Sequence, residues 1–214
     1  MFKKKPFFIV FEGVEGCGKS YQSKKLYNNL KKKKISSILT REPGGTGSAE
    51  LIRRLILKDY FNKNNKEKFD KYTDTLLYLA ARNEHVKNKI IPALKQRKVV
   101  ICDRFVDSTI AYQVYGKKVS LNFINDIHKI ILNGLKPNIT FILKVSPTTS
   151  KLRLSKRKIK NRYDKFDQSF YNKVQKSFLK IAKNKMNYYV FDSSKNDKVL
   201  ENKIINIVLK HIIK

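Results

Sequence analysis

The segment FEGVEGCGKS, residues 11–20, places two glycines, a lysine and a serine in the pattern G-x-x-x-x-G-K-S. Gly13 and Gly18 allow backbone N–H groups to turn toward an anion, and the helix start expected after them adds partial positive charge. Lys19 is expected to reach the β- and γ-phosphates of a nucleoside triphosphate, and the Ser20 hydroxyl to ligate Mg²⁺. The predicted ATP contacts of this loop are Gly13, Val14, Glu15, Gly16, Cys17, Gly18, Lys19 and Ser20. A glycine-rich turn without chemistry is the alternative.

A second group of charged residues follows the apolar run at 99–103. The sequence ICDRF places Asp103 and Arg104 where that run ends, and ligands of open α/β sheets bind at the carboxyl ends of strands. We expect Asp103 to hold Mg²⁺ through water and Arg104 to bind a phosphate. A surface salt bridge is the alternative, and the neighbouring phosphate-binding loop argues against it.

A third candidate is the sequence TREPGGT at 40–46. Its Pro-Gly-Gly turn can bring the backbone very close to a ligand, because glycine has no side chain to clash. Arg53 follows on the next predicted helix. These features extend the predicted phosphate site.

The elements that must position these residues alternate between strands and helices. We expect strands at 7–11, 35–40, 99–103, 140–145 and 188–192, mostly apolar throughout, as in strands buried on both faces. We expect helices at 20–33, 49–57, 73–95, 121–132, 148–159, 169–185 and 197–213. The pattern predicts an α/β fold with a five-stranded parallel sheet and helices on both faces. The polar segment 58–71 is expected to be an exposed loop, and residues 1–214 a single domain.

Composition narrows the function classes. The chain of 214 residues has 48 basic and 17 acidic residues, a net charge of +31, with its lysines scattered along the whole length. We interpret this as a solvated, compositionally biased surface, with attraction of polyanions as the alternative. Cys17 and Cys102 predict no disulfide framework. We interpret them as small residues in tight turns that could be neighbours, a redox-sensitive pair being the alternative. We expect a cytoplasmic protein that spans no membrane.

Six motifs together resemble the thymidylate kinase family, in its order and spacing and over nearly the whole chain. They are FEGVEGCGKS, REPGGT, LLYLAARNEHV (76–86), IIPAL (90–94), ICDRFVDSTIAYQ (101–113) and NRYD (161–164). The resemblance implies a P-loop kinase fold and Mg²⁺-dependent transfer of the γ-phosphoryl group of ATP to dTMP, giving dTDP for dTTP synthesis. It also implies a homodimer, and no specific binding of nucleic acid.

The resemblance implies roles for individual residues of this chain. Glu15 would meet the 3′-hydroxyl of dTMP near the metal, Tyr78 would stack on thymine, and Arg82 would donate to a thymine carbonyl. Tyr112 would lie near the 2′ position of the sugar, and Arg53 and Arg104 would clamp the phosphate. The implied dTMP site is Glu15, Glu42, Pro43, Arg53, Tyr78, Arg82, Arg104, Thr109, Tyr112 and Gln113. For Tyr78 and Arg82, an amphipathic helix with a snorkelling arginine is the alternative.

The basic segment 152–166 corresponds to the family's lid, which brings arginines to the transferred phosphoryl group. Some members carry such an arginine in the phosphate loop, where this chain has Cys17, so the resemblance is to the bacterial arrangement. Arg157 is the first candidate for a catalytic role, beside Lys19, Arg104 and Glu15, and Arg153 and Arg162 come next. The chain departs from the family at Asn161, which puts details of the lid in doubt, and at Asn138 and Tyr21, which affect local hydrogen bonding.

Two other functions fit part of the pattern. A nucleoside monophosphate kinase with another base preference would share the phosphate chemistry, since one methyl group separates dTMP from dUMP. A basic ATP-binding protein acting on nucleic acid would need a contiguous positive face, and it leaves Glu15, Tyr78 and Arg82 unexplained.

Overall fold

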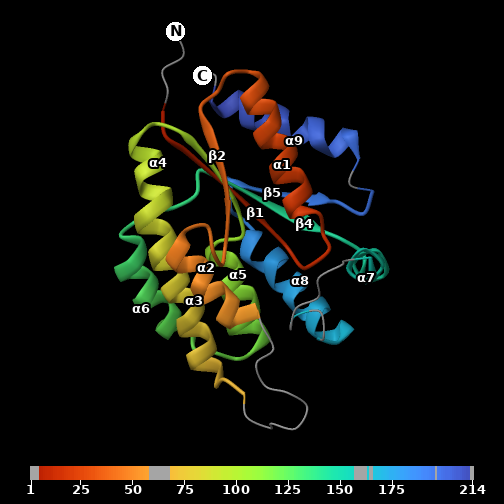
Figure 1. Cartoon of the computed structure of the whole chain (residues 1–214). Coiled ribbons are helices and arrows are strands. Elements are labelled where there is room, and N and C mark those ends of the chain that lie inside the picture. Colours follow the sequence, from red (N-terminus) through yellow and green to blue (C-terminus); the bar gives the residue numbers. More distant parts are fainter. Residues whose placement is uncertain (1–4, 58–67, 157–162, 164–165, 196, 213–214) are drawn as a thin grey trace.

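A parallel sheet of five strands forms the centre of the molecule (Figure 1). The computed structural model describes residues 5–57, 68–156, 163, 166–195 and 197–212. The strands are β1 (Phe7–Glu12), β2 (Ser37–Arg41), β3 (Val99–Asp103), β4 (Ile139–Lys144) and β5 (Tyr188–Asp192), in the order β2-β3-β1-β4-β5. All pairings are parallel. The predicted fold class and all five predicted strands are confirmed to within two residues at each end.

A helix lies within each predicted range, although residues 157–159 of the range 148–159 and residue 213 lie outside the described part. The helices are α1 (Lys19–Lys32), α2 (Gly47–Leu57), α3 (Lys71–His85), α4 (Ile91–Lys95), α5 (Val106–Thr109), α6 (Leu121–Leu132), α7 (Pro147–Ser155), α8 (Gln168–Ala182) and α9 (Lys198–Ile212), with two π-helical segments, η1 (Val86–Ile90) and η2 (Ile110–Gly116). Of the loop predicted at 58–71, residues 58–67 lie outside the described part. Residues 68–70 are irregular, and α3 begins at Lys71.

The helix predicted over 73–95 is interrupted. The structure divides it into α3, η1 and α4, with five π-helical residues in the middle. Pro92 explains the change of pitch, because proline has no N–H to donate to the carbonyl four residues earlier. The interruption lies next to the helix that carries Tyr78 and Arg82.

The sequence analysis missed the helical stretch α5–η2, residues 106–116. Its N-cap residue is Phe105, whose apolar side chain makes no capping hydrogen bond. A start without a local capping signal is not readable from sequence pattern. This stretch matters because it carries Thr109, Tyr112 and Gln113.

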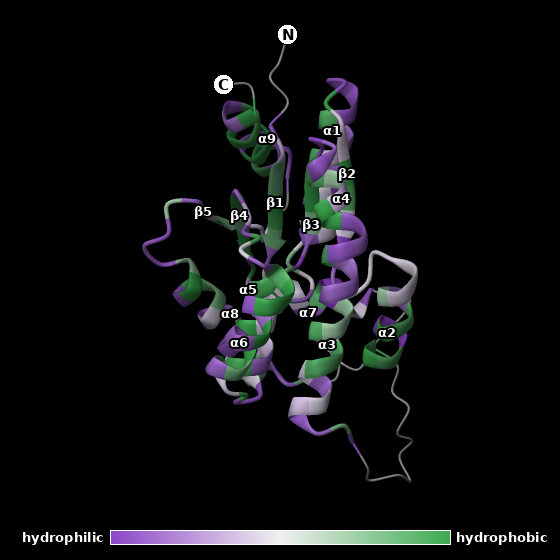
Figure 2. Cartoon of the chain, turned by 90° about the vertical axis from the view of Figure 1, so that its left-hand side faces the viewer, coloured by the Kyte–Doolittle hydropathy of each residue, from purple (hydrophilic) through white to green (hydrophobic). Residues whose placement is uncertain are grey.

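The core lies on the faces of the central strands, and Figure 2 shows β1 as a hydrophobic strand among the surrounding helices. Ile9 and Phe11 pack in one cluster with residues of α1 and α9, whereas Phe8 and Val10 pack in a second cluster with residues of η1 and α4. Cys17 belongs to the first cluster and Cys102, inside β3, to the second. The two cysteines are therefore not packed together, and Cys102 is not in a turn. None of the described helices has the length and apolarity needed to cross a membrane.

The parallel sheet brings the candidate site residues together at one edge. Asp103 is in register with Phe11 of β1 on one side and with Arg41 of β2 on the other. The phosphate loop, the REPGG turn and the segment after β3 therefore all leave the sheet at the same edge, as the carboxyl ends of parallel strands must.

Candidate active site

The phosphate loop lies tightly against β4. Gly13 has φ +139, and a Cβ there would lie 2.4 Å from the carbonyl oxygen of Leu143 and 2.8 Å from Cys17 Sγ. A larger residue would have to push the loop away from the strand. Val14 and Cys17 are buried in the core behind the loop, so they contribute backbone and packing to the predicted ATP site.

Lys19 lies in the curve of this loop. Its ammonium group donates to the carbonyl oxygens of Gly13, at 2.9 Å, and Val14, at 2.7 Å, and the residue is 6% exposed. These contacts hold the ammonium group close to the start of α1. The N-terminus of a helix also attracts anions, so both features favour a phosphate at this point.

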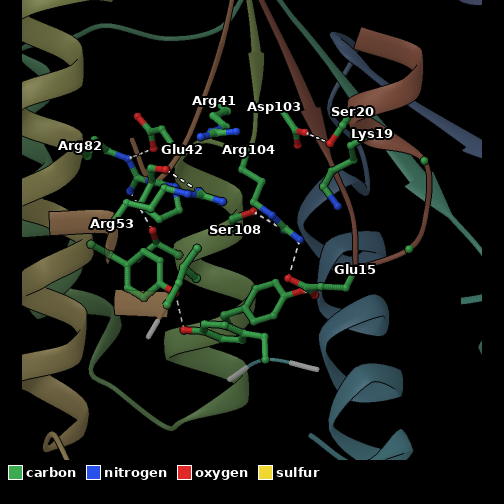
Figure 3. A pocket seen from close by; sticks show the side chains of 18 of the residues that line it. Glu15, Lys19, Ser20, Arg41, Glu42, Arg53, Arg82, Asp103, Arg104 and Ser108 are labelled. Carbon is green, nitrogen blue, oxygen red and sulfur yellow. Dashed lines mark hydrogen bonds and ion pairs between the residues drawn. The ribbon is translucent and has the colours of Figure 1, made fainter. Parts of the chain in front are cut away.

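Ser20 and Asp103 meet at the same end of the cleft, where the Ser20 hydroxyl donates to Asp103 Oδ2 (Figure 3). A hydroxyl and a carboxylate oxygen side by side are hard oxygen ligands. They match the few protein ligands that Mg²⁺ commonly takes beside phosphate and water. The described residues contain no cluster of three or more His, Cys, Asp or Glu suited to holding a metal without a substrate.

Arg104 lies at the centre of the cleft, between the phosphate loop and the segment after β3. Its Nη1 donates to the carbonyl oxygen of Gly13 at 2.9 Å and to Ser108 Oγ at 3.0 Å, and its Nη2 lies 2.8 Å from Glu15 Oε1 (Figure 3). Lys19 and Arg104 thus donate to one and the same carbonyl oxygen. Although burial opposes its charge, the pKa of Arg104 is raised well above its usual value, chiefly by Glu15.

Glu15 is the acidic partner at this point of the loop. Its other oxygen, Oε2, accepts a hydrogen bond from the Tyr112 hydroxyl. Burial acts to raise the pKa of Glu15, but Arg104 and Lys19 outweigh it, and the pKa is lowered. Glu15 is therefore an ionised carboxylate held between an arginine and a tyrosine.

More arginines line the cleft at the end of β2. Arg53 Nη1 donates to the carbonyl oxygen of Pro43 at 2.6 Å, and Glu50 pairs with Arg41, with 3.2 Å between Arg41 Nη2 and Glu50 Oε1. Burial and the nearby Arg41 lower the pKa of Arg53. Like charges held together in this way form a site that favours a polyvalent anion.

Arg82 crosses from α3 to three other elements. Its Nε lies 2.7 Å from Glu42 Oε2 and its Nη1 lies 2.8 Å from Thr109 Oγ1. Nη1 also lies 2.7 Å from His128 Nε2, and Nη2 donates to the carbonyl oxygen of Phe105 at 2.8 Å. Burial and Arg82 lower the pKa of His128 to about 3, so this imidazole is neutral and accepts. Four of the five guanidinium N–H groups of Arg82 have protein acceptors, yet the side chain still lines the cleft.

The aromatic part of the cleft is formed by Tyr78, Tyr112 and Tyr163. The hydroxyl groups of Tyr78 and Tyr163 are hydrogen-bonded, and the rings of Tyr112 and Tyr163 meet edge to face at 5.8 Å. Gln113 lines the same region, and its buried Nε2 has no hydrogen-bond partner among the described residues. An unused donor in an aromatic pocket is suited to a carbonyl oxygen on a planar ring.

The predicted ATP and dTMP residues meet at one cleft of about 480 Å³. The exceptions are Gly13, Val14 and Cys17, loop residues that are not among those lining the cleft, and Arg157, which with Arg162 lies outside the described residues. Arg153 lines the cleft, and its Nη1 donates to the Gly16 carbonyl of the phosphate loop at 3.1 Å.

Sequence reasoning assigned no role to several residues that line the cleft. They are Tyr21, Arg41, Leu57, Ser108 and Tyr163. Arg41, Ser108 and Tyr163 lie inside the quoted motifs REPGGT, ICDRFVDSTIAYQ and NRYD, which was the available signal. Leu57 lies one helical turn beyond Arg53, whereas Tyr21 carried no usable signal.

Comparison with known proteins agrees with this geometry. Residues 11–204 match the family model described as thymidylate kinase. A thymidylate kinase of Wolbachia pipientis wMel is 45% identical over 205 residues, which is 93% of this chain and 98% of that protein. One from Aster yellows witches'-broom phytoplasma is 43% identical over 94% of both chains. The crystal structure of thymidylate kinase from Ehrlichia chaffeensis is 30% identical, with a TM-score of 0.71, covering 95% of this chain and 99% of that one.

Proposed function

Since the chain belongs to the thymidylate kinase family, we propose that its cleft transfers the γ-phosphoryl group of ATP to dTMP, with the phosphate loop holding the donor and the arginine cluster the acceptor. The products are ADP and dTDP. The enzyme class follows from the family. The residue roles below are the part that we infer for this chain.

One observation carries the proposal, namely that Lys19 and Arg104 donate to the same oxygen, the Gly13 carbonyl, each at 2.9 Å. The ammonium group of Lys19 and the guanidinium group of Arg104 therefore face the same small part of the cleft. Phosphoryl transfer needs donor and acceptor phosphates in line and their negative charge neutralised. Two anchored cations at one point of the loop support that role.

The acceptor phosphate would bind to Arg41, Arg53 and Arg104. Glu50 pairs with Arg41, the Pro43 carbonyl accepts from Arg53, and Glu15 pairs with Arg104. These contacts hold the guanidinium groups in place before the ligand arrives. A site arranged in advance has less side-chain entropy to lose on binding. Glu15 would lie next to the sugar, with Tyr112 behind it.

The base would lie between Tyr78 and the α5–η2 stretch. Gln113 Nε2 is a donor without a partner in the described structure, and a thymine carbonyl oxygen would satisfy it. Arg82 would add its remaining N–H, but its four protein contacts suggest that it mainly shapes the pocket. Pro43 and Leu57 offer apolar surface for a methyl group.

Mg²⁺ would be held by Ser20 and, through water, by Asp103, and it would supply charge neutralisation at the donor phosphates. The ammonium group of Lys19 would give up its hydrogen bonds to the Gly13 and Val14 carbonyls and donate to those phosphates instead. The backbone N–H groups of the loop and the start of α1 would cover the remaining oxygens. No proton acceptor is required, because the attacking group is already a phosphate oxygen.

The lid, residues 152–166, would close over ATP as part of a single domain of residues 1–214. Arg157 remains the first candidate to reach the transferred phosphoryl group. Arg153 would instead hold the phosphate loop in place, because its guanidinium group donates to the carbonyl oxygens of Gly16, Ser193 and Ser194.

A homodimer is the proposed assembly. Leu51 and Leu55 of α2 and Leu76 of α3 are 57%, 43% and 46% exposed, and the two helices pack against each other. Apolar side chains on adjacent helices favour a partner surface. Light scattering after gel filtration tests this, and Leu51→Glu should yield monomers. We further propose a cytoplasmic location, which cell fractionation would check.

The decisive experiment is a coupled ADP-release assay with ATP and Mg²⁺ and five acceptors: dTMP, dUMP, dCMP, dGMP and AMP. We expect dTMP to give the highest kcat/KM, with dUMP second by about 10–200-fold, since a methyl group in an apolar pocket contributes about 1–3 kcal/mol. Arg104→Met should remove most activity with every acceptor. A better rate with AMP or dGMP would overturn the assigned base site, and an absence of ADP release with any acceptor would overturn the function.

A further inference from the structure

Glu12, the last residue of β1, is a fully buried carboxylate at the edge of the sheet where the cleft forms. It is not among the residues that line the cleft. Its Oε1 accepts hydrogen bonds from the backbone N–H of Phe105, at 2.8 Å, and of Ser108, at 3.1 Å. The Ser108 hydroxyl donates to its other oxygen, Oε2, at 2.5 Å. In the described structure, these hydrogen bonds of the Glu12 side chain all go to the segment that follows β3.

These bonds supply what the segment lacks locally. The first N–H groups of a helix have no partners within the helix, and Phe105 offers no side-chain oxygen to α5. Glu12 takes that place from the neighbouring strand. The Arg104 N–H also donates to the Phe11 carbonyl at 2.9 Å, so β1 holds the turn at several adjacent points.

The turn needs such support. Arg104 has φ 72, a left-handed conformation that costs a side chain other than glycine or asparagine about 1 kcal/mol or more. It is retained only where the surroundings over-determine it. This conformation brings the guanidinium group to Glu15 (Figure 3) and to the carbonyl oxygen of Gly13.

Ser108 connects the buried carboxylate to that guanidinium. Its Oγ donates to Glu12 Oε2 and accepts from Arg104 Nη1 at 3.0 Å. A hydroxyl has a single proton. When Oγ donates its proton in a hydrogen bond to the Glu12 carboxylate, only lone pairs of Oγ remain, and one of them accepts from Arg104. With Glu15 at 2.8 Å on Nη2, the guanidinium group is held on two sides.

We propose that Glu12 is a positioning residue that acts through Ser108 to hold Arg104 ready for the phosphate of the nucleotide acceptor. The inference rests on the proposed function in one respect, because it takes Arg104 as a ligand of that phosphate. It assigns Glu12 no contact with substrate.

The test compares the binding of dTMP and thymidine by calorimetry, because only dTMP carries the phosphate. At pH 9, where Glu12 is mainly ionised, Ser108→Ala should raise the Kd of dTMP about three- to tenfold, the size of effect expected from losing one ordinary hydrogen bond, and leave the Kd of thymidine unchanged. Ser108→Thr keeps the hydroxyl and should restore dTMP binding. Ser177→Ala, which removes a helix hydroxyl bonded to the Lys173 carbonyl, is the matched control and should change neither Kd.

Glu12→Gln keeps Oε1 as acceptor for both N–H groups but turns a donor toward Ser108. At pH 9, where the carboxylate is the main form of Glu12, this substitution should weaken dTMP binding about as much as Ser108→Ala. The double variant should be no weaker than either single variant, because both remove the same link. Multiplying effects in the double variant would contradict a route through Ser108. If Glu12→Gln fails to fold, the pH dependence of dTMP binding in the wild type and in Ser108→Ala decides.

The link also predicts a pH response. Glu12 is faced by Cys102 of β3, Arg104, Asp107 of α5 and Tyr188 of β5, and burial, with Asp107 next, raises its pKa to about 8. The protonated form therefore predominates at pH 7 and the carboxylate form at pH 9. Over this range the preference for dTMP over thymidine should increase in the wild type and stay flat in Ser108→Ala.

Two failures are distinguishable. If the wild type binds dTMP no more tightly than thymidine, or transfers no phosphoryl group to it, the proposed function fails. If the wild type prefers dTMP, but Ser108→Ala and Glu12→Gln keep the same preference and the same pH slope, Glu12 is only structural and this inference is overturned.

Discussion

Arg82 and Glu42 form a buried ion pair with 2.7 Å between Nε and Oε2, and both side chains are 3% exposed. His85 occupies the other oxygen of Glu42, with 3.0 Å between Nδ1 and Oε1, and its Nε2 contacts Thr40 Oγ1 at 2.6 Å. The pair therefore joins the REPGG turn to the helix that carries the base pocket. Gly45 completes the junction, since a Cβ there would lie 2.6 Å from the His85 ring.

Removing one charge of this pair should be costly. Glu42→Gln leaves the Arg82 charge buried without its counter-ion, and we expect the free energy of unfolding to fall by about 3–5 kcal/mol in urea titrations. Asp192→Asn, at an exposed pair with Lys144, is the control and should cost about 0–1 kcal/mol. Equal effects of the two substitutions would show that burial does not strengthen the Arg82–Glu42 pair.

The same pair predicts a response to acid. Burial acts to raise the pKa of Glu42, but Arg82 and His85 outweigh it, and the pKa is lowered. The folded state thus binds the proton less readily than the unfolded chain, and the stabilisation is present above the ordinary pKa of 4.5 and lost as the pH falls through the folded-state value. The difference in unfolding free energy between wild type and Glu42→Gln should shrink from pH 6 to pH 3. A constant difference would contradict the lowered pKa.

Lys19 should act on catalysis more than on acceptor binding. Lys19→Met keeps the length of the side chain but removes the charge at the loop, and kcat should fall by about 10²–10³-fold, as when a single electrostatic contact to the transition state is lost. The Kd of dTMP should change less than about twofold. Lys24→Met, at an exposed position of the same helix, serves as the control. A normal kcat for Lys19→Met would remove the lysine from the donor site.

Arg153 and Arg157 should separate into two roles. Arg153→Ala loses the contacts to the Gly16, Ser193 and Ser194 carbonyls and should raise the KM of ATP about tenfold with little change in kcat. Arg157→Ala should lower kcat at least about a hundredfold with little change in either KM. Steady-state kinetics with both substrates varied measures each. A fall below about fivefold for Arg157→Ala would transfer the role to another lid arginine.

The Tyr78 hydroxyl should couple the base pocket to the lid. The hydroxyl of Tyr78 is hydrogen-bonded to the hydroxyl of Tyr163. Tyr78→Phe keeps the ring for stacking and should raise the Kd of dTMP about two- to fivefold. Tyr163→Phe should match it, and the double variant should add little, because the two hydroxyls share one bond. Independent, multiplying effects would show that the bond does not couple the two tyrosines.

The sequence by itself determined the sheet, most helices and the phosphate loop, because these depend on local pattern: apolar runs, helical spacing and glycines at fixed separations. Asp103 and Arg104 were predictable for the same reason, since they follow directly on a buried strand. The tertiary structure alone decided that α5–η2 forms, that Cys17 and Cys102 pack in separate clusters, and that Arg82 is engaged by Glu42, Thr109, His128 and Phe105. Each of these depends on partners far apart in the chain. Glu12 and Ser108 are 96 residues apart, and no local pattern records that a strand's last carboxylate will cap a helix on its neighbour.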